Sequence, residues 1–387
     1  MACFSCLFRR ADLSTQACKA NEEEVGGAHN FVLYSYEELR IATKDFSLQN
    51  KIGEGGFGSV YRGKLKNGKI AAIKVLSADS KQGTHEFLTE INIISDIEHE
   101  NLVKLYGCCV EGTHRILVYN YLEKNSLAQN FLGGGHNSIK LSWQARHAIC
   151  IGVARGLAYL HEDVLPYIIH RDIKASNILL DKDLTPKISD FGLAKLIPSS
   201  MSHVSTRVVG TLGYLAPEYG VGGKLTRKAD IYSFGVLLLE IICGRCNTNR
   251  RLPVEEQFLV ERAWQLYKKR KLVGLVDARL HGEFDANEAC RFLKVGLLCA
   301  QGTPHLRPAM STVVKMLTGQ APVTNWVTKP HLISDFFESD PKIMHGEEAR
   351  DPCSEGLNNG ASSSGTSTAA AATTFTDVYD PTVSEEG

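Results

Sequence analysis

The sequence contains no apolar run long enough to cross a membrane. Its most apolar stretch, residues 235–243, is nine residues long and is interrupted by Glu240, whereas a spanning helix needs about 20 apolar residues. The first ten residues also lack the sustained apolar core and the small-residue cleavage site of a secretory signal peptide. We therefore expect an intracellular protein.

The sequence also has no net charge, no internal repeat and no dense framework of cysteines. The 43 basic and 43 acidic residues cancel, but residues 331–387 hold 11 acidic and 2 basic residues, so the first 330 are basic. A mildly basic body suits an anionic ligand such as a nucleotide. The two Cys-x-x-Cys pairs, at residues 3–6 and 243–246, lie 240 residues apart. This spacing does not suit a four-cysteine zinc site.

What the sequence does have is one continuous patterned region of about 280 residues. It lies between an N-terminal leader (residues 1–45) and an acidic tail rich in Ser, Thr and Ala (residues 325–387), whose composition predicts disorder. The first part of the region (residues 46–122) favours strands at 59–64, 69–76, 103–110 and 115–121, with a helix at 84–97. The second part (residues 123–324) favours helices at 143–161, 228–243, 257–268, 286–299 and 310–317. This order predicts an α+β fold in two lobes.

A glycine-rich run opens the strand-rich part. Residues 53–58 read Gly-Glu-Gly-Gly-Phe-Gly, and Val60 follows. Glycines let a backbone approach phosphates closely and present its N–H groups to them. A flexible hairpin turn is the plain alternative. A dinucleotide-binding fold would need a helix directly after the glycines, whereas a strand and an Asn67-Gly68 hairpin follow here.

Lys74 ends the apolar strand segment Ala71-Ala72-Ile73. An unpaired ammonium is costly to bury, so Lys74 needs an anionic partner unless it extends to solvent. Nucleotide phosphates can provide negative charge. A carboxylate on the following helix can do so too, and Glu90 is the expected partner, with Glu86 one turn earlier as the alternative.

A polar loop at residues 170–177 lies between two apolar segments and contains Asp172 and Asn177. Thirteen residues after Asn177, Asp190 begins an Asp-Phe-Gly turn. Mg²⁺ prefers oxygen ligands, commonly one or two carboxylates together with substrate phosphates. Asp190 and Asn177 can supply such oxygens, which leaves Asp172 to orient a hydroxyl and accept its proton. The plain alternative is that both aspartates are turn residues.

These motifs together resemble the eukaryotic protein kinases, over about residues 46–320. The resemblance implies a bilobal kinase fold, with ATP and Mg²⁺ (or Mn²⁺) as cofactors. It implies that adenine meets backbone groups between Tyr119 and Leu122, that Asp230 is structural, and that Glu218 pairs with Arg307. The lysine motif reads Ala-Ala-Ile-Lys where the family pattern has Val-Ala-Ile-Lys. The residues implied for nucleotide binding are Ile52, Gly53, Glu54, Gly55, Gly56, Phe57, Gly58, Ser59, Val60, Lys74, Glu90, Asn120 and Leu122.

Within this family, Lys174 and the Gly-Thr-Leu-Gly-Tyr run at residues 210–214 resemble the serine/threonine kinases. Lys174 can neutralise the transferring phosphoryl group. Arg171 implies control by phosphorylation of the activation segment (residues 190–218), because a phosphate pairs bidentately with a guanidinium. Ser205 or Thr206 is the expected phosphosite, and Thr211 is expected to contact the catalytic loop (residues 170–177). A pseudokinase scaffold is the alternative function, but no motif residue is missing.

Residues 36–47 are similar to the segment that precedes the kinase domain of plant receptor-like kinases, so the chain resembles a receptor-like cytoplasmic kinase. Its first residues also resemble the cold-responsive protein kinase group. Ala2 excludes N-myristoylation, but S-palmitoylation of Cys3 and Cys6 beside Arg9 and Arg10 would anchor the chain at the inner face of the plasma membrane. A plain disordered leader is the alternative. The expected partners are protein substrates and an upstream receptor kinase; no nucleic acid is expected.

Overall fold

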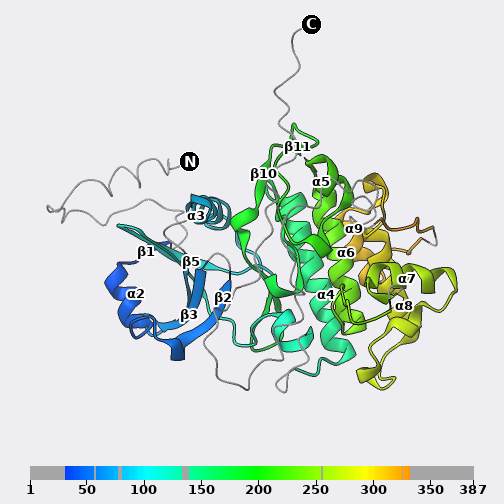
Figure 1. The fold of residues 1–387 in the computed structure, drawn as a ribbon, viewed down its shortest axis with the longest axis horizontal. Coiled ribbons are helices and arrows are strands. Elements are labelled where there is room, and N and C mark those ends of the chain that lie inside the picture. Colours follow the sequence, from blue (N-terminus) through cyan, green and yellow to red (C-terminus); the bar gives the residue numbers. More distant parts are fainter. Residues whose placement is uncertain are drawn as a thin grey trace, which may run out of the picture. The chain divides into compact units, whose positions relative to one another are not determined.

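The computed structural model describes residues 31–331 except 56–57, 77–80, 133–138, 254–255 and 325. The chain divides into two compact units (Figure 1). Unit 1 comprises residues up to Glu98 together with Val103–Tyr121, and unit 2 comprises His99–Leu102 and everything from Leu122 onward. Unit 1 is rich in strands and unit 2 in helices, which confirms the predicted α+β fold with a strand-rich and a helical lobe.

Unit 1 is built on a six-stranded sheet with the order β1-β5-β6-β4-β3-β2. All neighbouring strands are antiparallel except β1 and β5. The predicted Asn67-Gly68 turn joins β3 to β4, with Gly68 at φ +81° and Asn67 Oδ1 accepting the Lys69 N–H. The helix α3 (Lys81–Ile94) follows β4. The strands are β1 (Val32–Leu33), β2 (Lys51–Gly55), β3 (Gly58–Lys64), β4 (Ile70–Leu76), β5 (Leu105–Glu111) and β6 (His114–Asn120).

Two elements precede the region in which the sequence predicted structure. Strand β1 lies along β5, and the helix α2 (Tyr36–Ala42) begins at a capping box in which Ser35 and Glu38 satisfy each other's backbone N–H groups. Leu39 of α2 is fully buried in the core of unit 1. The predicted leader is therefore ordered over its last residues. A two-residue strand and a seven-residue helix are too short to show a periodic pattern.

The helix α6 (Arg227–Cys243) forms the centre of unit 2, and 15 of its 17 residues are buried. It is apolar on all sides, as expected for a helix surrounded by others. At its crossing with α8, a Cβ on Gly235 would lie 2.7 Å from the carbonyl oxygen of Gly296, so only glycine allows this approach. The other helices are α4 (Trp143–Ala158), α5 (Pro217–Gly222), α7 (Leu259–Lys268), α8 (Ala286–Cys299) and α9 (Met310–Leu317). The five predicted helices of this part correspond to α4, α6, α7, α8 and α9.

Three short antiparallel strand pairs complete unit 2: β7 with β10, β8 with β9, and β11 with β12. Residues 326–331, assigned from sequence to the tail, lie against this unit, because Gln301 bridges to Pro330 and the Tyr232 hydroxyl donates to the His331 carbonyl. The strands are β7 (Tyr167–Ile169), β8 (Ile178–Leu180), β9 (Pro186–Ile188), β10 (Lys195–Ile197), β11 (Val204–Ser205) and β12 (Lys224–Leu225).

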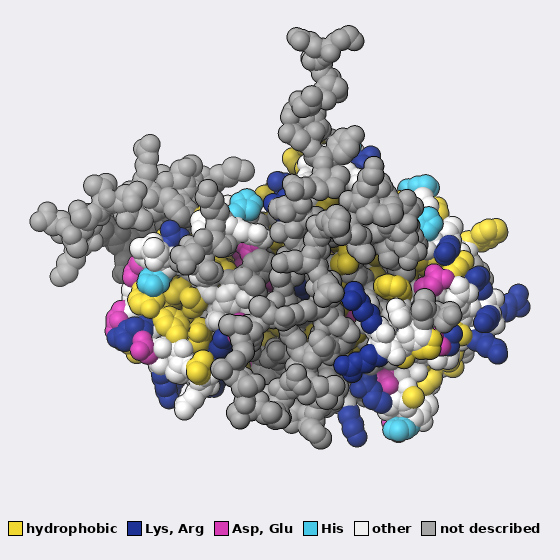
Figure 2. All heavy atoms as spheres, viewed as in Figure 1, with side chains coloured by type: hydrophobic (Ala, Val, Ile, Leu, Met, Phe, Trp, Pro, Cys, Tyr) yellow, Lys and Arg dark blue, Asp and Glu magenta, His cyan; other side chains and the backbone are white. Residues whose placement is uncertain are grey.

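Basic side chains mark the surface of unit 2. Figure 2 shows Lys and Arg side chains over the part of the unit that carries α7 and α8. Four consecutive exposed basic residues, 268–271, lie at the end of α7, where the negative end of the helix dipole favours positive charge. No helix within the described ranges is long and apolar enough to span a bilayer.

Candidate active site

The glycine run includes the end of β2 and the start of β3, where Gly55 pairs with Gly58. Gly58 has φ +138°, and a Cβ there would lie 1.9 Å from the carbonyl oxygen of Val75, so no other residue fits. A Cβ on Gly55 would meet no atom of the described residues within 4 Å, so the end of β2 has space beside it. Gly56 and Phe57 lie outside the described residues. Of the other predicted contacts, Ile52, Gly53 and Glu54 lie on β2, and Ser59 and Val60 on β3.

Lys74 on β4 lies opposite Val60 of β3 and forms an ion pair with Glu90 of α3. Its Nζ is 3.1 Å from Glu90 Oε2, and the two side chains are 16% and 1% exposed. The alternative partner, Glu86, accepts a hydrogen bond from Gln82. A buried carboxylate thus holds the lysine ammonium at a fixed place on the sheet.

The predicted adenine contacts lie at the end of β6. Asn120 is the last residue of that strand, and both its backbone N–H and its side-chain oxygen bond to the backbone of Lys104. Leu122, the first residue of unit 2 after the strand, is 8% exposed. The structure therefore fixes the backbone of Asn120 within unit 1.

Two strand pairs assemble the catalytic loop and the Asp-Phe-Gly turn within unit 2. Asn177 directly precedes β8 and Ser189 directly follows β9, so the antiparallel pairing places them together, and the Ser189 N–H donates to the Asn177 carbonyl at 2.9 Å. In the same way, the pairing of β7 with β10 brings the His170 ring edge-on to the Phe191 ring, with 4.8 Å between the two ring centroids. Residues 13 positions apart in the chain, Asn177 and Asp190, thereby come to one end of a hairpin.

The Asp172 carboxylate lies at the centre of a bonded network and is 4% exposed. Its Oδ1 accepts the Thr211 hydroxyl at 2.7 Å, and its Oδ2 accepts Lys174 Nζ at 2.9 Å and Asn177 Nδ2 at 3.0 Å. Lys174 Nζ also donates to Thr211 Oγ1 at 2.9 Å. The structure thus places three of the predicted residues around the Asp172 carboxylate and fixes its orientation.

The backbone of the catalytic loop is held by Asp230, a buried carboxylate on α6. Asp230 accepts the N–H groups of His170 and Arg171 at 2.7 and 2.9 Å, and His161 Nε2 lies 2.9 Å away. Burial alone would raise the pKa of Asp230, but the hydrogen bond and charge of His161 and the charge and N–H of His170 hold this pKa below its ordinary value. The ionised carboxylate therefore keeps Arg171 in its left-handed conformation (φ 72°), as the structural role implied for Asp230 requires.

The residues predicted to hold a metal ion have suitable chemistry. Asn177 Nδ2 donates to both the backbone carbonyl and the carboxylate of Asp172, so its side-chain oxygen is turned away from Asp172. Asp190, half-buried and in the left-handed conformation (φ 70°), offers a carboxylate two residues after β9. An amide oxygen and a carboxylate oxygen, with phosphate oxygens to complete the shell, are ligands that Mg²⁺ accepts.

The predicted phosphosites lie between β10 and α5. Ser205 is exposed on β11, opposite Lys224 of β12, and the Thr206 N–H donates to the Gly223 carbonyl. Arg171 does not meet either hydroxyl in this structure; its side chain donates to the Tyr219 hydroxyl and the Arg207 carbonyl. Cys3 and Cys6 lie outside the described residues.

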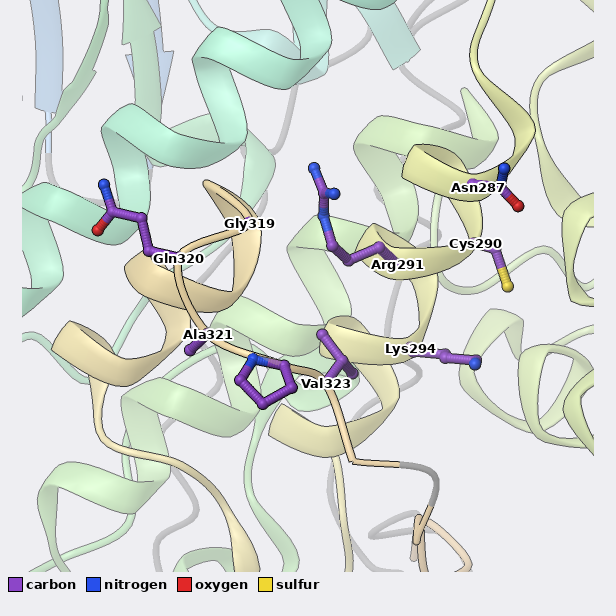
Figure 3. A pocket seen from close by; sticks show the side chains of 9 residues that line it. Asn287, Cys290, Arg291, Lys294, Gly319, Gln320, Ala321 and Val323 are labelled. Carbon is purple, nitrogen blue, oxygen red and sulfur yellow. The ribbon is translucent and has the colours of Figure 1, made fainter.

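A cavity of about 520 Å³ on unit 2 lies apart from these residues, between α8 and the segment after α9 (Figure 3). Arg291 extends toward the turn at Gly319 and donates hydrogen bonds to Glu288 and to the Leu317 carbonyl (Figure 3). Lys294 points away from that turn (Figure 3). No residue of the predicted site lines this cavity, and we assign it no catalytic role. Its walls are Asn287, Cys290, Arg291, Lys294 and residues 319–323.

Comparison with known proteins agrees with this geometry. The protein kinase domain family matches residues 46–317. The chain belongs to the protein kinase family. It is 66% identical to cold-responsive protein kinase 1 of Arabidopsis thaliana over 318 residues, which are 81% of this chain and 82% of that protein. Two probable LRR receptor-like serine/threonine-protein kinases of the same organism are 48% and 52% identical over 86% and 79% of this chain, which spans 32% and 29% of their lengths.

One buried carboxylate of this kinase has a role that the sequence did not reveal. Glu240, the residue that interrupts the apolar run of α6, is 1% exposed and accepts the Tyr214 hydroxyl at 2.7 Å and the Asn247 N–H at 2.6 Å. It thereby anchors the residues that follow Thr211. A charge within the otherwise apolar run of residues 235–243 was the available signal, since such a charge needs partners.

Glu240 is expected to make the stability of the kinase depend on pH. Burial raises the pKa of Glu240 from 4.5 to about 7, although its hydrogen bonds with Tyr214 and Asn247 act in the opposite direction. Between these values the folded state binds a proton that the unfolded state has released, so this group's contribution is complete below pH 4.5 and is lost as the pH rises to about 7. We expect the unfolding free energy of the wild type, minus that of Glu240→Gln, to fall by about 3 kcal/mol over this range. Urea denaturation of both proteins at several pH values measures this difference in unfolding free energy. A difference that does not change with pH would contradict the assignment.

Proposed function

We propose that this protein kinase transfers the γ-phosphoryl group of ATP to serine and threonine hydroxyls of protein substrates. The supporting observation is the Asp172 carboxylate, which is bonded to Lys174 and Thr211 in the arrangement that the family motif implies for serine/threonine kinases. The relatives named as serine/threonine-protein kinases support the same acceptor specificity. All the residues that a pseudokinase would lack are present.

The residues divide the chemistry among them. Asp172 orients the substrate hydroxyl and accepts its proton, while the Lys174 ammonium, 2.9 Å from that carboxylate, offsets negative charge on the transferring phosphoryl group. Backbone N–H groups of residues 53–58 and the Lys74 ammonium hold the phosphates, and backbone groups of Asn120 and Leu122 receive the adenine. Asn177 and Asp190 would hold Mg²⁺, or Mn²⁺ in its place. When bound, the metal ion would supply positive charge that neutralises the phosphate oxygens.

Removing divalent cations tests the cofactor assignment. Phosphate transfer from ATP to a serine-containing acceptor peptide is expected to stop when EDTA is added, because the phosphate charge is then no longer neutralised. Excess Mg²⁺ restores it, and Mn²⁺ restores it in part. Transfer that continues at an undiminished rate in excess EDTA would contradict the roles given to Asn177 and Asp190.

We further propose that phosphorylation of Ser205 or Thr206 raises the activity. A phosphate adds about two negative charges at neutral pH and can pair with the Arg171 guanidinium. Treatment of the active kinase with a protein phosphatase, followed by removal of the phosphatase, is expected to lower kcat. A Ser205→Ala/Thr206→Ala double variant would then show the lower kcat without treatment. A kcat that phosphatase leaves unchanged would refute this regulation.

The cellular role proposed is signalling at the inner face of the plasma membrane, with an upstream receptor kinase as activator. Two acyl chains on Cys3 and Cys6, together with adjacent arginines, meet the two-signal requirement for stable anchoring. A Cys3→Ser/Cys6→Ser double variant is expected to move from the membrane fraction to the soluble fraction. If it partitions like the wild type, these cysteines are not the anchor.

A further inference from the structure

The hydroxyl of Tyr219 joins three parts of unit 2. Tyr219 lies on α5 directly after Glu218 and is 1% exposed. Its hydroxyl oxygen accepts Arg171 Nε at 3.1 Å, Arg171 Nη2 at 2.8 Å and the Val209 N–H at 3.0 Å, and the hydroxyl donates to the Arg207 carbonyl at 3.1 Å. One buried side-chain atom thus connects the catalytic loop, the activation segment and α5.

Arg171 is held along one edge of its guanidinium by these contacts. Nη2 also donates to the Arg207 carbonyl at 2.8 Å, and the guanidinium carbon lies 5.8 Å from the centroid of the Tyr219 ring. A guanidinium has five N–H donors. The Nε and Nη2 edge is directed at Tyr219 and Arg207, and Nη1 carries the two remaining donors, which suit a phosphate oxygen.

The same contacts fix the chain that leads to the catalytic carboxylate. After Val209, Gly210 passes so close to the catalytic loop that a Cβ would lie 2.6 Å from the Arg171 carbonyl oxygen. The next residue, Thr211, donates its hydroxyl to Asp172. Holding residues 207–210 in place therefore holds Thr211 against Asp172.

We propose that Tyr219 is a positioning residue that keeps Arg171 and residues 207–210 in place without a phosphate. By holding these residues, the Tyr219 hydroxyl gives the unphosphorylated kinase a higher kcat than it would have without this contact. This inference rests on the proposed function. Phosphorylation of Ser205 or Thr206 supplies a second tie to Arg171 through Nη1, so the phosphorylated kinase depends less on the Tyr219 hydroxyl.

The test compares Tyr219→Phe with wild type in phosphatase-treated and phosphorylated forms. In the treated form kcat is expected to fall about tenfold, which corresponds to about 1.4 kcal/mol of barrier, with the KM for ATP unchanged. In the phosphorylated form the fall is expected to be less than about threefold. The ratio of the kcat of the phosphorylated form to that of the treated form is therefore larger for Tyr219→Phe than for wild type.

Tyr232→Phe is the matched control. Tyr232 is also 1% exposed and loses a hydroxyl that donates to the His331 carbonyl, so it reports the cost of removing a buried hydroxyl elsewhere in unit 2. It is expected to leave both kcat values unchanged. If Tyr219→Phe behaves like Tyr232→Phe in the treated form, or loses the same factor in both forms, the inference is overturned.

Hydrogen exchange separates this inference from the proposed function, because it requires no turnover. The amide of Val209 donates to Tyr219, so exchange of a peptide covering residues 207–210 is expected to become faster in Tyr219→Phe and not in Tyr232→Phe. Unchanged exchange in a catalytically active preparation overturns the positioning role alone. Faster exchange in a preparation whose wild type transfers no phosphate supports the tie and overturns the proposed function alone.

Discussion

Replacing Asp172 by Asn is expected to lower kcat by roughly 10²- to 10⁴-fold, the usual contribution of a general base. The amide cannot accept the proton of the substrate hydroxyl. Its NH₂ group would also face either Lys174 and Asn177 or the Thr211 hydroxyl, and all three donate hydrogen bonds to the present carboxylate. The measurement is steady-state transfer to a peptide, together with ATP affinity determined by titration.

ATP affinity is expected to stay within about twofold of wild type, because Asp172 is assigned to the hydroxyl and not to the nucleotide. Asp183→Asn is the control: Asp183 lies on the turn between β8 and β9 with a side chain that is 74% exposed, and its kcat should not change. A kcat of Asp172→Asn within tenfold of wild type, with ATP still bound, would contradict the role of general base given to Asp172.

Arg307→Ala is expected to destabilise unit 2 by about 3 kcal/mol, the lower end of the cost of removing one partner of a buried ion pair, because the Glu218 side chain left behind is 21% exposed. Arg307 Nη1 and Nη2 donate to the two carboxylate oxygens of Glu218 at 2.6 and 2.8 Å, which confirms the pairing implied by the family. The Arg307 side chain is fully buried, and it also donates to the carbonyls of Gln301 and Lys228 at 2.8 Å each. The variant would leave Glu218 and both carbonyls without this donor.

Arg262→Ala is the matched control for this prediction. Arg262 pairs with Glu256 at 3.1 Å, but the two side chains are 35% and 37% exposed, and such pairs contribute about 0–1 kcal/mol. Urea denaturation of both variants gives the comparison. If Arg307→Ala loses no more free energy of unfolding than Arg262→Ala, the Glu218–Arg307 pair is not the anchor of α5 that the structure indicates.

The long elements of the fold could be predicted because their side chains repeat with a clear period. The predicted limits of the helices 286–299 and 310–317 agree with α8 and α9, and the Asn67-Gly68 signal correctly marked a hairpin. The helix α2 was missed because seven residues show no period, although Ser35 and Glu38 form a capping box. Its place is set by the burial of Leu39 in the core, which no local pattern encodes.

The residues of the candidate site were predicted from linear motifs, and the structure brings several of them together. Their placement is set by strand pairing: Asn177 and Asp190 come to one end of a hairpin because β8 and β9 pair. Tyr219 and Glu240 escaped prediction because their partners are 48 and 26 residues away, Arg171 and Tyr214 respectively. The sequence shows such residues as polar groups in apolar or unremarkable surroundings, and only the folded chain shows what they bind.

The most direct test of the central claim is phosphate transfer from γ-labelled ATP, in the presence of Mg²⁺, to peptides that differ only in a serine, threonine or tyrosine acceptor. The full chain is expected to label the serine and threonine peptides, and Asp172→Asn is expected to label them roughly 10²- to 10⁴-fold more slowly. Labelling of the tyrosine peptide alone, or equal labelling by the wild type and Asp172→Asn, would contradict the assignment of this chain as a serine/threonine kinase that acts through Asp172.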